Sequence, residues 1–259
     1  MEFFDTISKT FLDFDSMLEV LPQLLKTGLT NTLIISISAT IIGIVLGMLV
    51  AVMGIAKTRW IRIPARIYTD LFRGLPAILT ILLIGRGFTG ISQDIFGPSP
   101  YPLGIIALSL IASAYIGEIF RSGIQSVEKG QLEACRALGM SYGRAMVLVV
   151  IPQGIRRVLP ALVNQFIAIV KDSSLVYFLG LLPMERELFR VGQDAAVLTG
   201  NLSPLVAAGI FYLIITVPLT HLVNYIDQKF RTGRRKATPP TSGLKEVSEL
   251  QSSTQGERA

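Results

Sequence analysis

The sequence predicts an all-α integral membrane protein with five transmembrane helices. Of its 259 residues, 51% are hydrophobic and only 16% are charged, and the mean hydropathy is +0.56. A soluble domain of this length usually contains about a quarter charged residues. The apolar residues also form long runs, and a helix needs about 20 of them to cross the hydrocarbon layer. Most of the chain is therefore expected to lie in lipid.

Five stretches have the length and composition of spanning helices. They are residues 30–55, 68–88, 102–120, 158–182 and 205–226. The second is shorter in its apolar centre, because Asp70, Arg73 and Arg86 flank it. The fourth contains Lys171 and Asp172 in its middle, where a charge costs several kcal/mol by some estimates. Its apolar flanks still favour a membrane position.

The distribution of basic residues predicts the orientation. Lys and Arg gather after the first span, between the third and fourth, and after the fifth. With five spans all three groups fall on one side, which is the cytoplasm by the positive-inside rule. We expect an extracytoplasmic segment at residues 1–28, a transmembrane domain at 29–226 and a cytoplasmic tail at 227–259. The N-terminus is then outside, the C-terminus is inside, and the Pro/Ser-rich tail is disordered.

Several functions are excluded by what the sequence lacks. The formal net charge is +6, but the basic residues lie between apolar runs, so we expect no nucleic-acid partner. Cys135 is the single cysteine and can form neither an intramolecular disulfide nor a cysteine-based metal site. No P-loop, His-Glu-x-x-His or Gly-x-Ser-x-Gly motif occurs. We therefore expect no catalytic residue, no metal site and no cofactor in this chain.

The cytoplasmic loop at about residues 123–157 contains a short helix-prone stretch, residues 131–138. Leu132, Cys135 and Leu138 form its apolar stripe, and Gly139 follows as a helix stop. A helix of about two turns is not stable alone in water, so it must dock on another surface. That surface is either the membrane helices of this chain or a partner.

The motifs of this loop resemble those of a known family. Glu133-Ala134-Cys135, Gly139 and Ile151-Pro152 are similar to the conserved cytoplasmic loop of binding-protein-dependent ABC importer permeases. Cys135 replaces the usual second Ala, and Val149 and Ile151 replace Ile and Leu. The polar amino-acid branch (histidine/glutamine/glutamate type) is the more specific match. Its motifs here are FRGLP at 72–76, with Leu75 where Thr is common, AYIGEIFR at 114–121, GQLEA at 130–134 and KDSSL at 171–175.

The resemblance extends over about residues 28–226, and it implies a type I ABC importer permease fold in a bacterial plasma membrane. It also implies a second permease, identical or related, and two ATP-binding cassette subunits that bind ATP and Mg. An extracytoplasmic amino-acid-binding protein would deliver the substrate. The short loop helix would be the coupling helix that contacts the ATPase. Its expected residues are Glu133, Ala134, Cys135, Leu138 and Gly139.

Polar residues within the spans are candidates for a substrate path. The fourth span contributes Asn164, Lys171, Asp172, Ser173 and Ser174, and Arg73 and Glu118 belong to the second and third. Such groups must face protein or a water-filled cavity. Asp172 can accept a substrate ammonium group, and the serine hydroxyls can bond either end of a zwitterion. The alternatives are that Lys171 and Asp172 only fix helix packing, that Arg73 is a topological anchor, and that Glu118 pairs with a cytoplasmic arginine.

Other functions remain as alternatives to an ATP-driven importer. A secondary transporter or channel is disfavoured by the absence of a visible inverted repeat and by the structured cytoplasmic loop. A purely structural membrane subunit is disfavoured by the charged fourth span. The sequence leaves open which amino acid is carried and whether the permease pairs with itself or with a sister chain.

Overall fold

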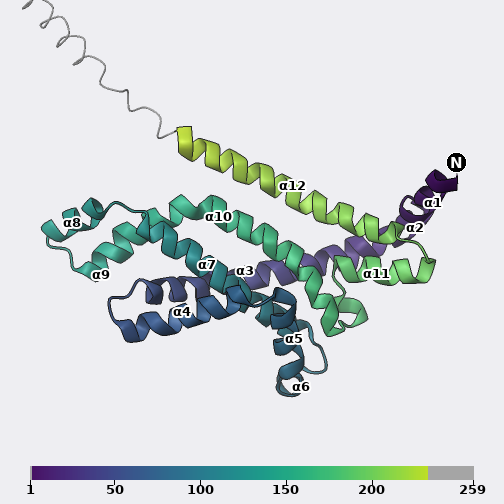
Figure 1. Cartoon of the computed structure of the whole chain (residues 1–259), viewed down its shortest axis with the longest axis horizontal. Coiled ribbons are helices and arrows are strands. Elements are labelled where there is room, and N and C mark those ends of the chain that lie inside the picture. The colour runs from purple at the N-terminus through teal and green to yellow at the C-terminus, as the bar shows by residue number, and fades with distance from the viewer. Residues whose placement is uncertain (1, 233–259) are drawn as a thin grey trace, which may run out of the picture. The chain divides into compact units, whose positions relative to one another are not determined.

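The computed structural model describes residues 2–232, and all regular elements within that range are helices (Figure 1). Most of the expected C-terminal tail, from residue 233 on, lies outside the described residues. The chain divides into one unit that ends at Val223 and a second that begins at Asn224. The membrane-length helical segments are Phe4–Gly54, Tyr101–Gln125, Tyr142–Leu179 and Ser203–Gln228. These agree with the first, third, fourth and fifth predicted spans.

The second predicted span is a pair of helices. Helix α4 (Arg59–Gly74) and helix α5 (Ala77–Gly87) are together long and apolar enough to cross a membrane, but they are bent by 105° relative to each other. Pro76 lies between them, and Leu75 before it is extended at φ −82°, ψ 143°. A residue before proline avoids the helical region for steric reasons. The second predicted span, at 68–88, is therefore bent at Pro76, and together the two helices are apolar enough to cross.

Helix α3 (Thr30–Gly54) and helix α7 (Tyr101–Gln125) lie side by side and run parallel. Their glycines allow the close approach. A Cβ added at Gly43 would lie 2.9 Å from the Ala112 Cβ, and one added at Gly54 would lie 3.4 Å from Arg121. The contacts thus advance in the same direction along both helices. Because the parallel helices α3 and α7 both begin at the same end of the bundle, the segment between them, which contains α4 and α5, must return the chain to that end.

Helix α10 (Ile151–Asp172) packs against α7 in the antiparallel direction. A Cβ at Gly123 would lie 2.7 Å from the Gly154 carbonyl, whereas a Cβ at Gly104 would meet Val176, just beyond α10, at 2.5 Å. The 3₁₀ segment η3 (Ser173–Leu179) continues α10, so the predicted fourth span changes its helical form after Asp172. We call the end of this bundle where α7 finishes the α8 end, after helix α8 (Lys129–Ala137). The opposite end is the α11 end, after helix α11 (Leu188–Thr199).

The two largest of the three apolar cores in the described residues hold most of these helices together. The larger is formed by α3, α5, α7, α10 and η3 around residues such as Ile35, Ile81 and Leu108. The second lies at the α11 end, where Leu24 and Leu188 pack with Phe211 of helix α12 (Ser203–Thr232). The remaining helices are α1 (Glu2–Phe11), α2 (Phe14–Gln23), η1 (Leu24–Leu29), α6 (Thr89–Phe96), α9 (Tyr142–Ala145), η2 (Met146–Val150) and η4 (Pro183–Glu185).

Candidate functional site

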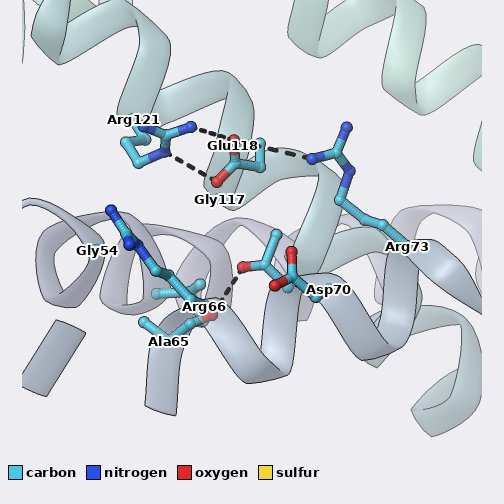
Figure 2. Close-up of a pocket in the computed structure, with 10 residues that line it drawn as sticks. Gly54, Ala65, Arg66, Asp70, Arg73, Gly117, Glu118 and Arg121 are labelled. Atoms are coloured by element: carbon cyan, nitrogen blue, oxygen red, sulfur yellow. Dashed lines mark hydrogen bonds and ion pairs between the residues drawn. The ribbon is translucent and has the colours of Figure 1, made fainter. Parts of the chain in front are cut away.

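A charged cavity of about 260 Å³ lies between α3, α4 and α7, towards the α8 end (Figure 2). Small residues in its lining leave room for the cavity, and charged side chains surround it. The lining residues are Val50, Gly54, Ala65, Arg66, Thr69, Asp70, Arg73, Gly117, Glu118 and Arg121. We call this the α4–α7 cavity.

The spacing of charges on α4 explains why they meet there. Arg66, Asp70 and Arg73 follow one another at intervals of four and three residues, which places them on one helical face. The neighbouring face holds the buried Ala65 and Thr69 against the bundle. Part of the charged stripe is thus directed towards α7.

Glu118 joins two arginines from different helices (Figure 2). The Arg121 guanidinium donates to both Glu118 carboxylate oxygens, at 2.9 Å and 2.5 Å. The Arg73 Nη1 lies 3.8 Å from Glu118 Oε2, and its guanidinium lies over the Tyr115 ring at 5.3 Å. The predicted pairing of Glu118 with an arginine is therefore confirmed by the geometry. Arg73 also lines the cavity.

Two other charged groups of the cavity are without such partners. Within the described residues, the side chains of Arg66 and Asp70 make no hydrogen bond or salt bridge. Both residues line the cavity and are exposed. In addition to the ion pairs of Glu118, the cavity therefore contains an arginine guanidinium and a carboxylate that are available to a ligand. A zwitterion such as an amino acid needs both kinds of group, a guanidinium for its carboxylate and a carboxylate for its ammonium.

The polar stripe of the fourth span lies apart from this cavity. None of Asn164, Lys171, Asp172, Ser173 and Ser174 belongs to the lining. Ser173 Oγ donates to the Val170 carbonyl and Ser174 Oγ to the Lys171 carbonyl, each at 2.7 Å. Within the described part of the chain, the side chains of Lys171 and Asp172 form neither a hydrogen bond nor a salt bridge. The structure thus brings together Arg73 and Glu118 and leaves the α10 residues as a separate group.

The loop helix predicted at 131–138 is present as α8, at Lys129–Ala137. Leu132 packs against the core formed by Ile124 and Met146, and Cys135 is buried. Glu133 and Ala134 are exposed, and Leu138 is 84% exposed just beyond the helix. Gly139 follows at φ +81°, the left-handed conformation predicted for a helix stop. The helix therefore rests one face on its own chain and leaves another face free.

Sequence reasoning did not single out Arg66, Asp70 and Arg121 as members of the site. The available signal was the regular spacing of charged residues from Arg59 to Arg73, which an interior membrane helix would not show. Sequence reasoning also missed Glu187, which is fully buried at the start of α11. Its signal was a carboxylate placed immediately before an apolar helix, the position of an N-cap.

A bundle of apolar helices with a charged cavity and a projecting loop helix defines a multi-pass membrane transport component. The chain belongs to the family of binding-protein-dependent transport system inner membrane components, whose model matches residues 43–232. It is therefore a multi-pass protein of the bacterial inner membrane and a permease subunit of an ABC importer, with no enzymatic activity of its own.

Named relatives match most of the chain. The arginine transport system permease protein ArtQ of Bacillus subtilis (strain 168) is 34% identical over 85% of this chain and 98% of its own length. A glutamate/aspartate import permease protein GltK of Escherichia coli O157:H7 is 33% identical over 84% of this chain and 97% of its own length.

Solved structures show the same fold. A chain in the crystal structure of an amino acid ABC transporter with histidines is 33% identical and has a TM-score of 0.73. That match covers 84% of this chain and 99% of the other. A chain of the inward-facing MetNI methionine ABC transporter is 17% identical with a TM-score of 0.66, over 80% of this chain and 97% of the other. This second likeness concerns the fold alone.

Proposed function

We propose that the chain forms the translocation path of an ATP-driven importer for polar amino acids of the glutamine, glutamate and basic group. The observation that supports this function is the α4–α7 cavity, in which Arg66, Arg73 and Arg121 face Asp70 and Glu118. Both charge signs are available to a zwitterion within one space. The names of the relatives, which include arginine and glutamate/aspartate systems, support the same substrate class.

The proposed path joins two groups of residues. Arg73 and Glu118 belong to the cavity at the α8 end. The second group belongs to α10 and η3: Asn164 lies midway along α10, and Lys171, Asp172, Ser173 and Ser174 lie nearer the α11 end. An amino acid that crosses the bundle would meet the α10 group first and the cavity later. Asp172 would receive the ammonium group, and Arg73 the carboxylate at the exit.

Uptake kinetics test this path. We expect Asp172→Asn and Arg73→Gln each to lower the rate of uptake by about tenfold or more at unchanged abundance, since a charged hydrogen bond contributes about 1.5–3 kcal/mol. Arg156→Gln serves as a control, because Arg156 is exposed and lies outside both groups. Wild-type kinetics for Asp172→Asn and Ser173→Ala together would refute the role of α10.

The proposed partners are two ATP-binding cassette ATPase subunits, a second permease and an extracytoplasmic amino-acid-binding protein. The ATPases would bind ATP and Mg, and this chain would hold no cofactor. Glu133, Ala134 and Leu138 are free to contact an ATPase, whereas Cys135 fixes α8 to its own chain. In this arrangement the α8 end faces the cytoplasm and the N-terminus lies outside.

Purification of the tagged protein from native membranes in mild detergent tests these partners. We expect a P-loop ATPase at about one copy per permease, and its loss in a Glu133→Ala/Leu138→Ala variant. Both side chains are exposed, so the variant is expected to fold. Recovery of the protein alone, where other membrane complexes stay intact, would instead favour a secondary transporter or channel.

A further inference from the structure

A second and larger cavity opens beside the α4–α7 cavity at the α8 end. Its volume is about 500 Å³, and it shares Gly54, Arg66 and Arg121 with the smaller cavity. The end of α3, the start of α4, the end of α7 and the coupling loop all contribute to its lining. We call it the basic cavity.

The charged residues around the basic cavity are mostly cationic. Arg62, Arg66, Arg121 and Lys129 line it, against one carboxylate, that of Glu128. Arg121 is already bonded to Glu118. Within the described residues, however, the side chains of Arg62, Arg66 and Lys129 form no hydrogen bond or salt bridge. The cavity therefore has excess positive charge that an anion can neutralise.

The floor of the basic cavity is apolar. Ile55, Ile124, Val127, Met146 and Val150 contribute to it, and they belong to one packed cluster. A small hydrophilic anion gains nothing from such a floor. A molecule with an anionic head and apolar chains gains from both parts of the lining.

The outer face of α4 indicates that lipid surrounds this region. Trp60 is 87% exposed and Ile67 is 62% exposed, on a face of the helix that Arg59 borders and that lies away from Arg62. Tryptophan is enriched at the membrane–water interface, and a helix with an apolar face beside a basic one is typical of that depth. Arg62 and Lys129 thus lie where phospholipid headgroups are found.

We propose that the basic cavity binds the headgroup of an anionic phospholipid such as phosphatidylglycerol. The phosphate would lie between Arg62, Arg66 and Lys129, and the start of the acyl chains would lie on the apolar floor of the cavity. Basic pockets between membrane helices bind anionic headgroups in this way. Because Leu132, Tyr142 and Met146 of the coupling loop also line the cavity, the bound lipid would contact the loop that holds α8.

Native mass spectrometry of the purified protein in detergent, with phosphatidylglycerol or phosphatidylcholine added, tests this site. We expect the wild-type protein to retain phosphatidylglycerol in preference to phosphatidylcholine. Arg62→Gln/Lys129→Gln should weaken this retention by about tenfold or more, at about 1 kcal/mol for each basic residue. The matched control Arg59→Gln/Arg156→Gln removes the same charge outside the cavity lining and should retain the lipid as the wild type does.

Three results would overturn the proposal. Equal retention of both lipids by the wild type would mean that no anionic site exists. If the cavity variant and the control variant lost the same amount of phosphatidylglycerol, the lipid would bind to a diffuse basic surface and not to this cavity. Displacement of the lipid by inorganic phosphate at a similar concentration would assign the cavity to a soluble anion. Each readout is binding, so it is independent of whether the protein imports amino acids.

Discussion

At the scale of single residues, Glu187 has an environment that is unusual for a carboxylate. It is fully buried and caps α11, accepting hydrogen bonds from the Phe189 and Arg190 backbone amides at 2.6 Å and 2.7 Å. The Tyr212 hydroxyl of α12 donates to it at 3.0 Å. Burial raises its pKa to about 7, although these hydrogen bonds and the Arg190 charge act in the opposite direction. The side chain thus links two helices and titrates near neutral pH.

The raised pKa of Glu187 predicts a pH-dependent stability. Between the ordinary carboxyl pKa of 4.5 and the folded value of about 7, the folded state retains a proton that the unfolded chain has lost. Stability should therefore fall as the pH rises through this interval, by at most ~3 kcal/mol. In Glu187→Gln this fall should be largely absent. Thermal unfolding of the wild type and of Glu187→Gln in detergent at pH 4.5 to 8 measures this difference, and equal slopes in the two proteins would contradict it.

Gly139 is a residue whose role follows from its backbone alone. Its φ is +81° and no atom lies within 4 Å of a Cβ added there, so only the backbone conformation resists substitution. Gly139→Val should cost about 1–2 kcal/mol locally and shift the turn after α8. Asparagine tolerates this conformation better. We expect Gly139→Val to separate ATP hydrolysis from uptake in the assembled importer, and Gly139→Asn to retain most coupling. Equal activity of both variants would contradict a role for this turn.

The cavity residues show how far sequence reasoning extends at this scale. Glu118 and Arg121 are three residues apart on one helix, so their pairing could be predicted from α7 alone. Arg66 and Asp70 become site residues only because α4 crosses α7 there. Ser173 and Ser174 were predicted as path residues from residue type. Their hydroxyls donate to carbonyls of their own helical segment, a local option that residue type does not reveal.

At the scale of helices, the sequence predicted the number of apolar segments better than their shapes. Hydropathy over residues 68–88 averages across Pro76, so it could not show the 105° bend between α4 and α5. The same measure could not show that η3 replaces regular α-helix after Asp172. Both differences depend on backbone geometry within an apolar stretch. Long uninterrupted helices such as α7 were predicted closely, because composition and length suffice for them.

The α3–α7 pair predicts a clear effect of small substitutions. A Cβ at Gly47 would lie 2.9 Å from the Ser113 carbonyl oxygen, whereas one at Gly209 of α12 would meet no atom within 4 Å. Gly47→Ala should therefore destabilise the bundle by about 1–3 kcal/mol through overpacking. Gly209→Ala, the same change in an open position, should leave thermal stability unchanged or slightly raised. A comparison of the two melting temperatures in detergent isolates the packing effect from helix propensity.

At the scale of the whole molecule, two independent arguments lead to five crossings. The basic residues alternate correctly with the spans only if the segment between the first and third spans crosses the membrane. The parallel arrangement of α3 and α7 requires the same return, and Tyr101 at the start of α7 lies within 3.4 Å of Asn31 at the start of α3. We therefore expect the bent α4–α5 pair to make a full crossing and not a re-entrant loop.

Accessibility of single cysteines on either side of α4–α5 tests this topology. Thr58 precedes the pair, Pro98 follows it, and both are exposed. Cys135, the single native cysteine, is first replaced by serine. In intact spheroplasts we expect a membrane-impermeant thiol reagent to label Pro98→Cys, and to label Thr58→Cys only after the membrane is opened. The reverse pattern would keep the five crossings and invert the orientation. Labelling of both positions from one side would make α4–α5 re-entrant, and the parallel packing of α3 and α7 could then not lie within a single bilayer.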